Sequence, residues 1–177
     1  MSTKINIAQI IRDHLDTLRT YQGRRLIVQD VLFFYGIPVV LALGLVWMGL
    51  SITSFLSTIL ITSLSIFAAL LFNLLLLAYD IVQRPDKGRQ KLKRRFLKEA
   101  YANISYCILI SLISVLVLLA FEILSPLLEK TGQAIFSACF EKAIFFIVYF
   151  LVIHFFLSLL MVLKRIHVMM SREFEHS

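Results

Sequence analysis

The amino-acid sequence predicts an all-α integral membrane protein: a four-helix bundle with both termini cytoplasmic, preceded by an amphipathic N-terminal helix. The first observation is a set of four apolar blocks at residues 31–50, 52–79, 104–124 and 143–163. A helix needs about 20 apolar residues to cross a hydrocarbon core of roughly 30 Å, and each block has that length. None of the blocks contains a Lys or Arg, so we expect each to span the membrane.

The second observation is the uneven distribution of basic residues around these blocks. Sixteen of the 18 Lys and Arg residues lie before the first block, between the second and third, or after the fourth. Four crossings place these three segments on the same side of the membrane, and the positive-inside bias makes that side cytoplasmic. The chain is therefore predicted to be a multi-pass membrane protein with both termini in the cytoplasm.

The third observation is the composition, which argues against a soluble helical domain. Hydrophobic residues make up 59% of the chain, whereas about 45–50% is usual in soluble domains. Helices of a soluble all-α domain have one polar face, but the first, third and fourth blocks are apolar almost all round. The net charge of +7 restates the cytoplasmic bias, so it does not by itself indicate nucleic-acid binding.

Residues 1–29 are predicted to form a cytoplasmic N-terminal segment with an amphipathic helix over 5–21. Three- and four-residue spacing defines its apolar stripe, which consists of Ile7, Ile10, Ile11, His14, Leu18 and Tyr21. Such a helix either lies on the inner membrane surface or packs against a protein partner, and both placements are open. We expect no cleavable signal peptide, because the charged segment before the first block is long and partly acidic.

The first block contains a proline and is followed by a short loop. Pro38 removes a backbone donor, and a neighbouring helix can satisfy the carbonyl that is freed. Trp47 is expected near the outer interface, where aromatic rings anchor helices. The loop at residues 49–51 is so short that we expect the first two blocks to pack as a tight antiparallel hairpin.

The second block carries its small and polar residues on one face. The candidate pore or packing face consists of Ser54, Thr58, Thr62, Ser65 and Asn73. Their spacing places them on one side of a helix. We expect the opposite face to contact lipid, and it carries Leu56, Leu60, Phe67, Leu70, Leu71 and Leu74. The polar face either packs against another helix or, in an oligomer, lines a water-filled path.

Residues 80–100 are predicted to form a cytoplasmic connector whose second half, 89–100, is a basic helix. Its candidate docking residues for a partner or for lipid are Arg84, Arg89, Lys91, Lys93, Arg94, Arg95 and Lys98. These cations either set the topology and attract anionic lipid or dock a soluble cytoplasmic protein. Aromatic side chains are not interleaved with them for base stacking, so we expect no direct sequence-specific nucleic-acid binding.

Polar residues recur in the last two blocks. The third block, which we expect to end at Ser125 and Pro126, has one face with Asn103, Cys107, Ser111 and Ser114. Residues 127–142 are then predicted to form a short helix on the outer surface. Because Cys107 and Cys139 would lie at different membrane depths, we expect no disulfide between them.

His154 is a possible intramembrane polar site near the middle of the fourth block. It shares a helix face with Ser158 and with Arg165 of the cytoplasmic tail, residues 164–177. An ionisable residue at this depth raises the hypothesis of a functional site. The structural alternative is a neutral histidine that is hydrogen-bonded to a neighbouring span.

The sequence contains no pattern typical of an enzyme. It has no glycine-rich phosphate loop, no CxxC and no HExxH. A nucleophile needs a base at the same depth, and the pairing of Ser111 or Ser114 with His154 is the single candidate. We therefore expect no catalytic activity, no cofactor and no metal site.

Three stretches carry a resemblance to a known family. They are IAQIIRDHLDTLRTYQGRR, DVLFFYGIP and FNLLLLAYDI, the last followed by the basic connector. Together with the overall layout they resemble small four-span membrane proteins of bacterial antiviral defence operons, in particular the membrane subunit of the Kiwa system. The resemblance implies a homo-oligomer that holds a soluble, nucleic-acid-binding partner at the bacterial inner membrane, and it assigns no site residues.

The function predicted on these grounds is that of a non-enzymatic, oligomeric membrane scaffold or sensor that recruits a soluble cytoplasmic partner, in antiphage defence. The first alternative is an oligomeric pore that depolarises the membrane through the polar face of the second block. The second alternative is a small-solute or ion transporter. It is disfavoured because the sequence lacks the internal repeats and broken helices that such sites use.

Overall fold

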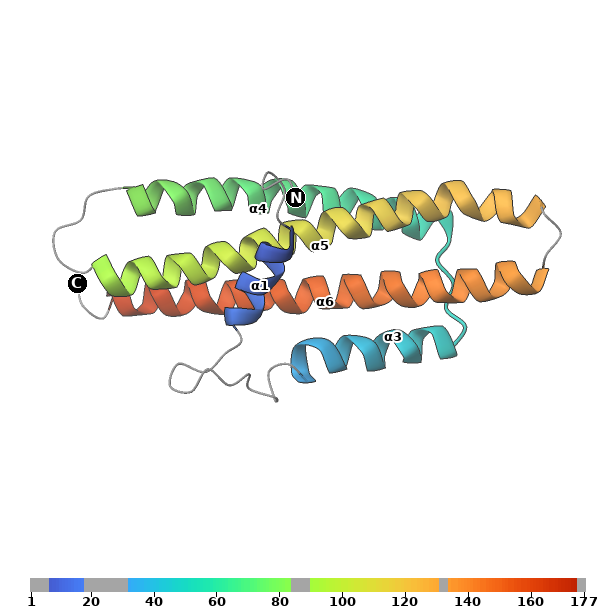
Figure 1. Cartoon of the computed structure of the whole chain (residues 1–177), viewed down its shortest axis with the longest axis horizontal. Coiled ribbons are helices and arrows are strands. Elements are labelled where there is room, and N and C mark those ends of the chain that lie inside the picture. The colour runs from blue at the N-terminus through green and yellow to red at the C-terminus, as the bar shows by residue number, and fades with distance from the viewer. Residues whose placement is uncertain (1–6, 18–31, 84–89, 131–133, 175–177) are drawn as a thin grey trace.

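The computed structural model describes residues 7–17, 32–83, 90–130 and 134–174, and these residues contain helices and no strand (Figure 1). In chain order the elements are α1 (Ile7–Thr17), the π-helical turn η1 (Leu32–Gly36), α3 (Ile37–Trp47), α4 (Ser54–Gln83), α5 (Gln90–Lys130) and α6 (Ala134–Phe174). The all-α prediction is therefore confirmed for the part of the chain that the structure describes.

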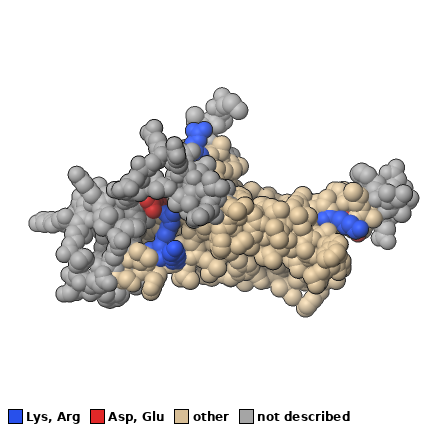
Figure 2. Space-filling model, turned by 90° about the horizontal axis from the view of Figure 1, so that it is seen from below, with Lys and Arg blue, Asp and Glu red and all other residues tan. Residues whose placement is uncertain are grey.

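Three helices are long and apolar enough to cross a membrane. Their apolar stretches are Ser54–Ile81 of α4, Leu97–Leu127 of α5 and Ala138–Val168 of α6. Figure 2 shows a broad belt without Lys, Arg, Asp or Glu between charged residues towards the two ends. Hydrocarbon can surround such a belt, so the chain has the architecture of a helical membrane protein.

The first predicted block forms a shorter helix than the other three. Leu32–Trp47 is continuous through η1 and α3, and its 16 residues reach only about 24 Å at 1.5 Å per residue. Gly49 follows the C-cap of α3, and its φ of +74° is one that glycine adopts readily. Bonds from Leu50 N to Leu45 O and from Gly49 N to Val46 O close a Schellman motif there.

Buried residues at alternating steps of three and four pack the long helices together. This spacing is the heptad repeat of left-handed helix packing. On α5 the buried positions with this spacing are Leu97, Ala100, Ile104, Cys107, Ser111, Ser114, Leu118 and Phe121. On α6 they are Val148, Leu151, Phe155, Ser158 and Val162. Small residues in the seam of α5 allow the neighbouring backbones to approach closely.

The expected hairpin between the first two blocks is wrong. Among the described elements, α3 packs against α6, and α4 packs against α5 with no close backbone contact to α3. The reason lies in the loop, where residues 50–53 have no helical turn and separate the two helices. Tyr149 of α6 places its hydroxyl 3.5 Å from the carbonyl oxygen of Leu50. Thr53 then caps α4, because its Oγ1 accepts a bond from Leu56 N.

The short outer-surface helix predicted at 127–142 is also not observed. Helix α5 continues through Pro126 to Lys130, and α6 begins at Ala134. An internal proline removes one backbone bond, which α5 tolerates here because the pair of helices continues to pack. Phe121 and Phe145 lie 5.5 Å apart between ring centroids on these two helices. At the other end, the basic helix expected over 89–100 is the first part of α5.

Candidate functional site

Two features of the described structure are candidates for function. The first, which we call the α1 cluster, joins α1 to α5, α6 and η1, and its members are His14, Thr17, Glu99, Asn103, Tyr106, His154 and Arg165. The second, the α4 polar face, comprises Ser54, Thr58, Thr62, Ser65 and Asn73. We refer to the end of the molecule where α4 ends at Gln83 and α5 begins at Gln90 as the connector end, and to the opposite end as the Trp47 end.

Helix α1 is held against α5 by one fully buried side chain. His14 is 0% exposed, and its Nδ1 lies 2.9 Å from Oδ1 of Asn103. Its ring stacks on the ring of Tyr106, with centroids 3.8 Å apart and planes 5° apart. By contrast, Ile7 and Ile11 of the predicted stripe are 45% and 38% exposed, and Ile10 is only partly buried against the core, so the histidine is the most deeply buried side chain of this helix.

A second set of contacts holds the last residue of α1. Arg165 of α6 donates from Nη2 to the backbone oxygen of Thr17 at 3.0 Å and from Nη1 to Glu99 of α5 at 2.8 Å. The last carbonyls of a helix lack helical donors and carry partial negative charge, so a guanidinium is a suitable partner. The Thr17 hydroxyl lies 3.0 Å from Asn103 Oδ1. Three helices therefore meet at the end of α1.

Tyr106 connects this docking site to the start of α3. Its hydroxyl lies 2.8 Å from Nε2 of His154, and Nδ1 of His154 lies 3.0 Å from the backbone oxygen of Phe34. A carbonyl can only accept, so Nδ1 carries the proton and the neutral Nε2 accepts from Tyr106. In an α-helix the donor to Phe34 would be residue 38, a proline without an N–H. His154 supplies the donor that Pro38 lacks.

Three buried polar atoms near this site have no hydrogen-bond partner among the described residues: His14 Nε2, Asn103 Nδ2 and Ser158 Oγ. Helices α5 and α6 are antiparallel, with Glu99 beside Arg165 and Tyr106 beside His154. Asn103 lies between Glu99 and Tyr106, and Ser158 lies between His154 and Arg165, so Ser158 and Asn103 are at a similar level. A buried polar atom without a partner costs about 1–3 kcal/mol. The docked arrangement of α1 therefore carries a penalty that offsets part of its contacts.

The environment of His14 favours its neutral form. Burial lowers its pKa from 6.5 to about 4, and the positive charge of Arg165 and the neighbouring His154 act in the same direction, although the bond to Asn103 opposes them. At neutral pH the ring is therefore uncharged, as its position between helices requires.

The α4 polar face points away from the rest of the molecule. Its five residues are all exposed, whereas Leu64 and Leu71 of the same helix are 2% and 5% exposed and pack in the core. Leu60, Phe67 and Leu74 are partly buried against that core. The expectation that the leucine-rich face contacts lipid is therefore wrong for most of its members. Long apolar side chains fill the contact with α5, and the small polar ones are left outside.

The polar groups on this face differ in their need for a partner. The hydroxyls of Thr58 and Thr62 each donate 2.9 Å bonds to the carbonyl four residues earlier, Ser54 and Thr58 respectively. Such bonds within the helix satisfy a hydroxyl in lipid. Asn73 is exposed, and no hydrogen bond to its amide is found within the described residues. It lies eight residues from the end of the span, or about 12 Å deep by the helical rise.

The structure does not bring together the serine and histidine considered for catalysis. Ser111 donates to the carbonyl of Ile108 and Ser114 to that of Ile110, while both nitrogens of His154 have other partners. Within the described residues there is no group of three or more His, Cys, Asp or Glu that could hold a metal ion.

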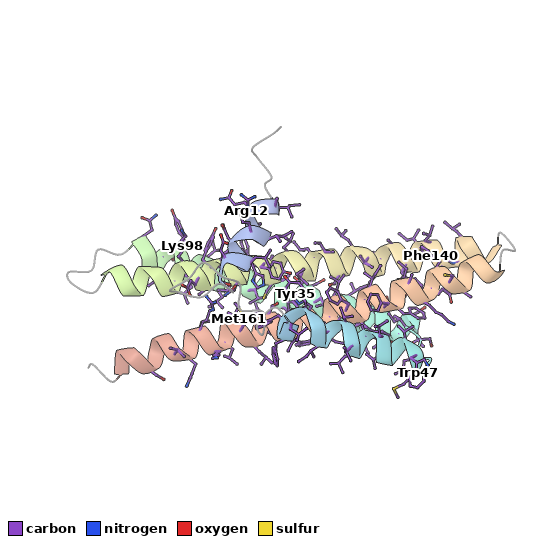
Figure 3. The ribbon with its side chains drawn as sticks, turned by 60° about the horizontal axis from the view of Figure 1, so that its bottom comes forward. Arg12, Tyr35, Trp47, Lys98, Phe140 and Met161 are labelled. Carbon is purple, nitrogen blue, oxygen red and sulfur yellow. The ribbon has the colours of Figure 1, made fainter. Side chains whose placement is uncertain are left out.

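Most of the predicted docking cations cannot be placed. Arg84 and Arg89 lie outside the described residues, and so do the side chains of Lys91, Lys93, Arg94 and Arg95, although the backbone from Gln90 onward is helical. Lys98 is exposed at the connector end (Figure 3).

The α1 cluster itself was not predicted from the sequence. The sequence placed His14 on the inner face of α1, Asn103 on the polar face of the third block, and Arg165 on the face of His154. What it could not supply was the pairing of these faces, because His14 and Asn103 are 89 residues apart. The one local signal was Pro38, which required a donor from a neighbouring helix.

The chain matches no family model, no curated protein and no solved structure. The resemblance to the Kiwa membrane subunit therefore stays a prediction.

Proposed function

We propose that this chain is the protomer of a homo-oligomeric scaffold of the bacterial inner membrane that recruits a soluble cytoplasmic partner. In this proposal the chain crosses the membrane four times, and both termini and the basic connector are cytoplasmic. The observation that carries it is the outward direction of the α4 polar face. The antiviral role implied by the resemblance is part of the same proposal.

The position of α4 supports assembly through this helix. Only 11% of its most apolar window is buried, compared with 33% in each of the other two long helices, so most of its surface is available to another chain. Lipid cannot bond to the Asn73 amide, and an unsatisfied polar group in hydrocarbon costs several kcal/mol. An amide both donates and accepts, so Asn73 residues of two copies can satisfy each other.

Assembly through α4 would also gather the connectors. Helix α4 ends at Gln83, directly before the first connector cation, Arg84. Copies joined through α4 therefore hold several basic connectors at one end of the assembly. Several weak sites on one scaffold bind a partner more tightly than a single site does, because the later contacts form intramolecularly.

The test is purification in mild detergent from cells that carry the native operon, followed by native mass measurement. The wild-type chain should appear as an oligomer with a co-purifying partner. Asn73→Leu removes the amide and should lower the oligomer fraction about threefold to tenfold, the effect of roughly 0.6–1.4 kcal/mol for an interhelical hydrogen bond. Phe72→Leu changes the adjacent residue, which is 52% exposed, and should leave the oligomer intact.

The partner is tested separately by changing Lys93, Arg94 and Arg95 to Glu. We expect this variant to keep its oligomeric state and to lose the partner, because the docking cations become acidic. A wild-type chain that is monomeric at all detergent concentrations would contradict the scaffold. A partner that is retained by the triple variant would show that the connector does not dock it.

The α4 polar face also favours the alternative function of an oligomeric pore. Hydroxyls that face a shared axis can line a water-filled path. A pore should release a dye from proteoliposomes, and Thr62→Leu should reduce that release. Intact oligomers that release no dye would leave the scaffold as the function that fits this face.

A further inference from the structure

We infer that α1 is a releasable latch on α5 and α6, nearer their connector end than their Trp47 end, and that Tyr106 couples this latch to the anchor of α3. The inference concerns how the proposed scaffold is regulated. Its evidence lies within one chain, and its test reads α1 alone. A monomeric chain could therefore pass the test even if the scaffold proposal failed.

The first argument is that helix α1 is attached through few apolar side chains. His14 is fully buried and stacks on Tyr106, while Thr17 makes polar contacts with Asn103 and, through its carbonyl, with Arg165. Ile10 is partly buried against the core, but Ile7 and Ile11 are left outside. Because water or lipid headgroups can replace polar contacts, this attachment is reversible in a way that a leucine-filled interface is not.

The second argument is that α1 cannot persist alone. Its described part has 11 residues. Short isolated helices are marginal in water, because most helical stability in proteins comes from tertiary packing. Release from α5 therefore unfolds α1. The docked state is an ordered helix, and the released state is a disordered segment. A segment of this kind is a two-state element whose population a ligand can shift.

The third argument is the position of Tyr106 between the two contacts. The ring of Tyr106 forms the surface on which His14 stacks, and its hydroxyl bonds to the histidine that holds the Phe34 carbonyl. After loss of the bond to His154, the tyrosine hydroxyl keeps the longer 3.5 Å contact with the Tyr35 hydroxyl. The ring is then held less firmly and can turn, which removes the parallel surface beneath His14. By reciprocity, release of α1 weakens the anchor of α3 by the same factor.

The geometry in Figure 3 fits this role. Tyr35, at the start of the α3 segment, lies about midway between Lys98 and Phe140, and Arg12 of α1 lies towards the Lys98 end. An event that displaces α1 at the connector end would thus reach the start of α3, well inside the belt of apolar residues. A partner that binds the exposed side of α1 or competes for its docking site would provide such an event.

The latch is tested by amide hydrogen exchange of the full chain in nanodiscs, read at residues 7–17. The exchange of wild-type α1 amides should be slowed about 10²- to 10⁴-fold relative to an unfolded segment. This protection is smaller than the protection expected for amides in the spans. Asn103→Ala removes the partner of His14 and should raise exchange at least tenfold. Arg12→Ala, on the exposed side of the same helix, should not change it. Protection of α6 core amides shows that each variant is folded.

The coupling is tested with two variants that leave the α1 contacts in place. His154→Phe and Tyr106→Phe each remove the bond between these residues, and each should raise α1 exchange about fivefold, as expected for a coupling of order RT ln 5. The double variant should exchange no faster than either single one, because both remove the same bond. Phe156→Leu, at an exposed position of α6, is the matched control.

Several results would overturn the inference. Unprotected wild-type amides would mean that α1 is not docked, and protection equal to that of α6 would mean that it is not released. An Asn103→Ala variant with wild-type exchange would show that the cluster does not hold the helix. Additive effects in the double variant, or no effect of either single one, would remove the coupling through Tyr106.

Discussion

At the scale of single residues, the two buried histidines are neutral for different reasons. His154 has a partner on each nitrogen, since it donates to the Phe34 carbonyl and accepts from Tyr106. His14 has a partner on Nδ1, while its buried Nε2 has none among the described residues. A proton added to Nε2 of His14 would place a charge between helices, near Arg165. Its neutrality is therefore linked to the docking of α1.

This linkage predicts that acid releases α1. The pKa of His14 is about 4 when docked and about 6.5 when released. Docking is therefore strongest above pH 6.5 and weakens as the pH falls from 6.5 towards 4, where both states are protonated. Relative to about pH 7.5, the released fraction should rise roughly tenfold near pH 5.5. Amide exchange of residues 7–17, corrected for the pH dependence of intrinsic exchange, measures this.

Other groups near His14 also have to be separated from this effect. Arg165 and His154 of α6 and Glu99 and Tyr106 of α5 belong to the same cluster. His14→Gln keeps a donor for Asn103 and removes the titrating ring, so it should abolish most of the change between pH 6.5 and 4. A His14→Gln chain with the full wild-type pH dependence would show that His14 does not cause the effect.

At the scale of the elements, a proline explains why α3 packs on α6. Pro38 cannot donate to the Phe34 carbonyl, and the turn η1 that precedes it is π-helical. His154 of α6 supplies the missing donor, and Pro38 itself is buried. The helix that follows, Ile37–Trp47, is thereby placed along α6 and not along α4, its nearest neighbour in the sequence.

The dependence of this contact on the proline can be measured with a double-mutant cycle. His154→Phe should lower the free energy of unfolding by about 1–2 kcal/mol, because it leaves a buried carbonyl without a donor. In a Pro38→Ala background residue 38 has an N–H, so the same change should cost about 0.5 kcal/mol or less. Unfolding in mixed detergent micelles gives the four values. Equal costs in both backgrounds would show that Pro38 does not determine the role of His154.

The elements also show what could be predicted from the sequence. The spans of α4, α5 and α6 follow from length and hydropathy alone, and the need for a donor near Pro38 follows from its missing N–H. The direction of the α4 polar face could not be predicted, because Leu64 and Leu71 are equally compatible with lipid or protein contact, and Asn73 can face a helix of the same chain or of a second copy. Pairings such as His14 with Asn103 depend on which faces meet, and no local signal encodes that.

At the scale of the whole molecule, the proposed fourth crossing depends on the segment before α4. Helix α1 docks on α5 through Asn103, which lies six residues inside the Leu97–Leu127 span. Trp47 lies further towards the opposite end, where α4 begins (Figures 1 and 3). Leu32–Trp47 is apolar but shorter than the three long spans. Whether this segment crosses the membrane decides on which side α1 lies relative to Lys98.

Cysteine labelling in spheroplasts tests this topology together with its orientation. Cys139 is exposed towards the Trp47 end, and Cys107 is fully buried. A membrane-impermeant maleimide should therefore label Cys139 in intact spheroplasts and leave Cys107 unlabelled. In a Cys139→Ser background, Arg12→Cys and Lys98→Cys replace two exposed residues, and both should be labelled only after the membrane is permeabilised. Labelling of Lys98→Cys without permeabilisation would reverse the orientation, and opposite behaviour of Arg12→Cys and Lys98→Cys would eliminate the fourth crossing.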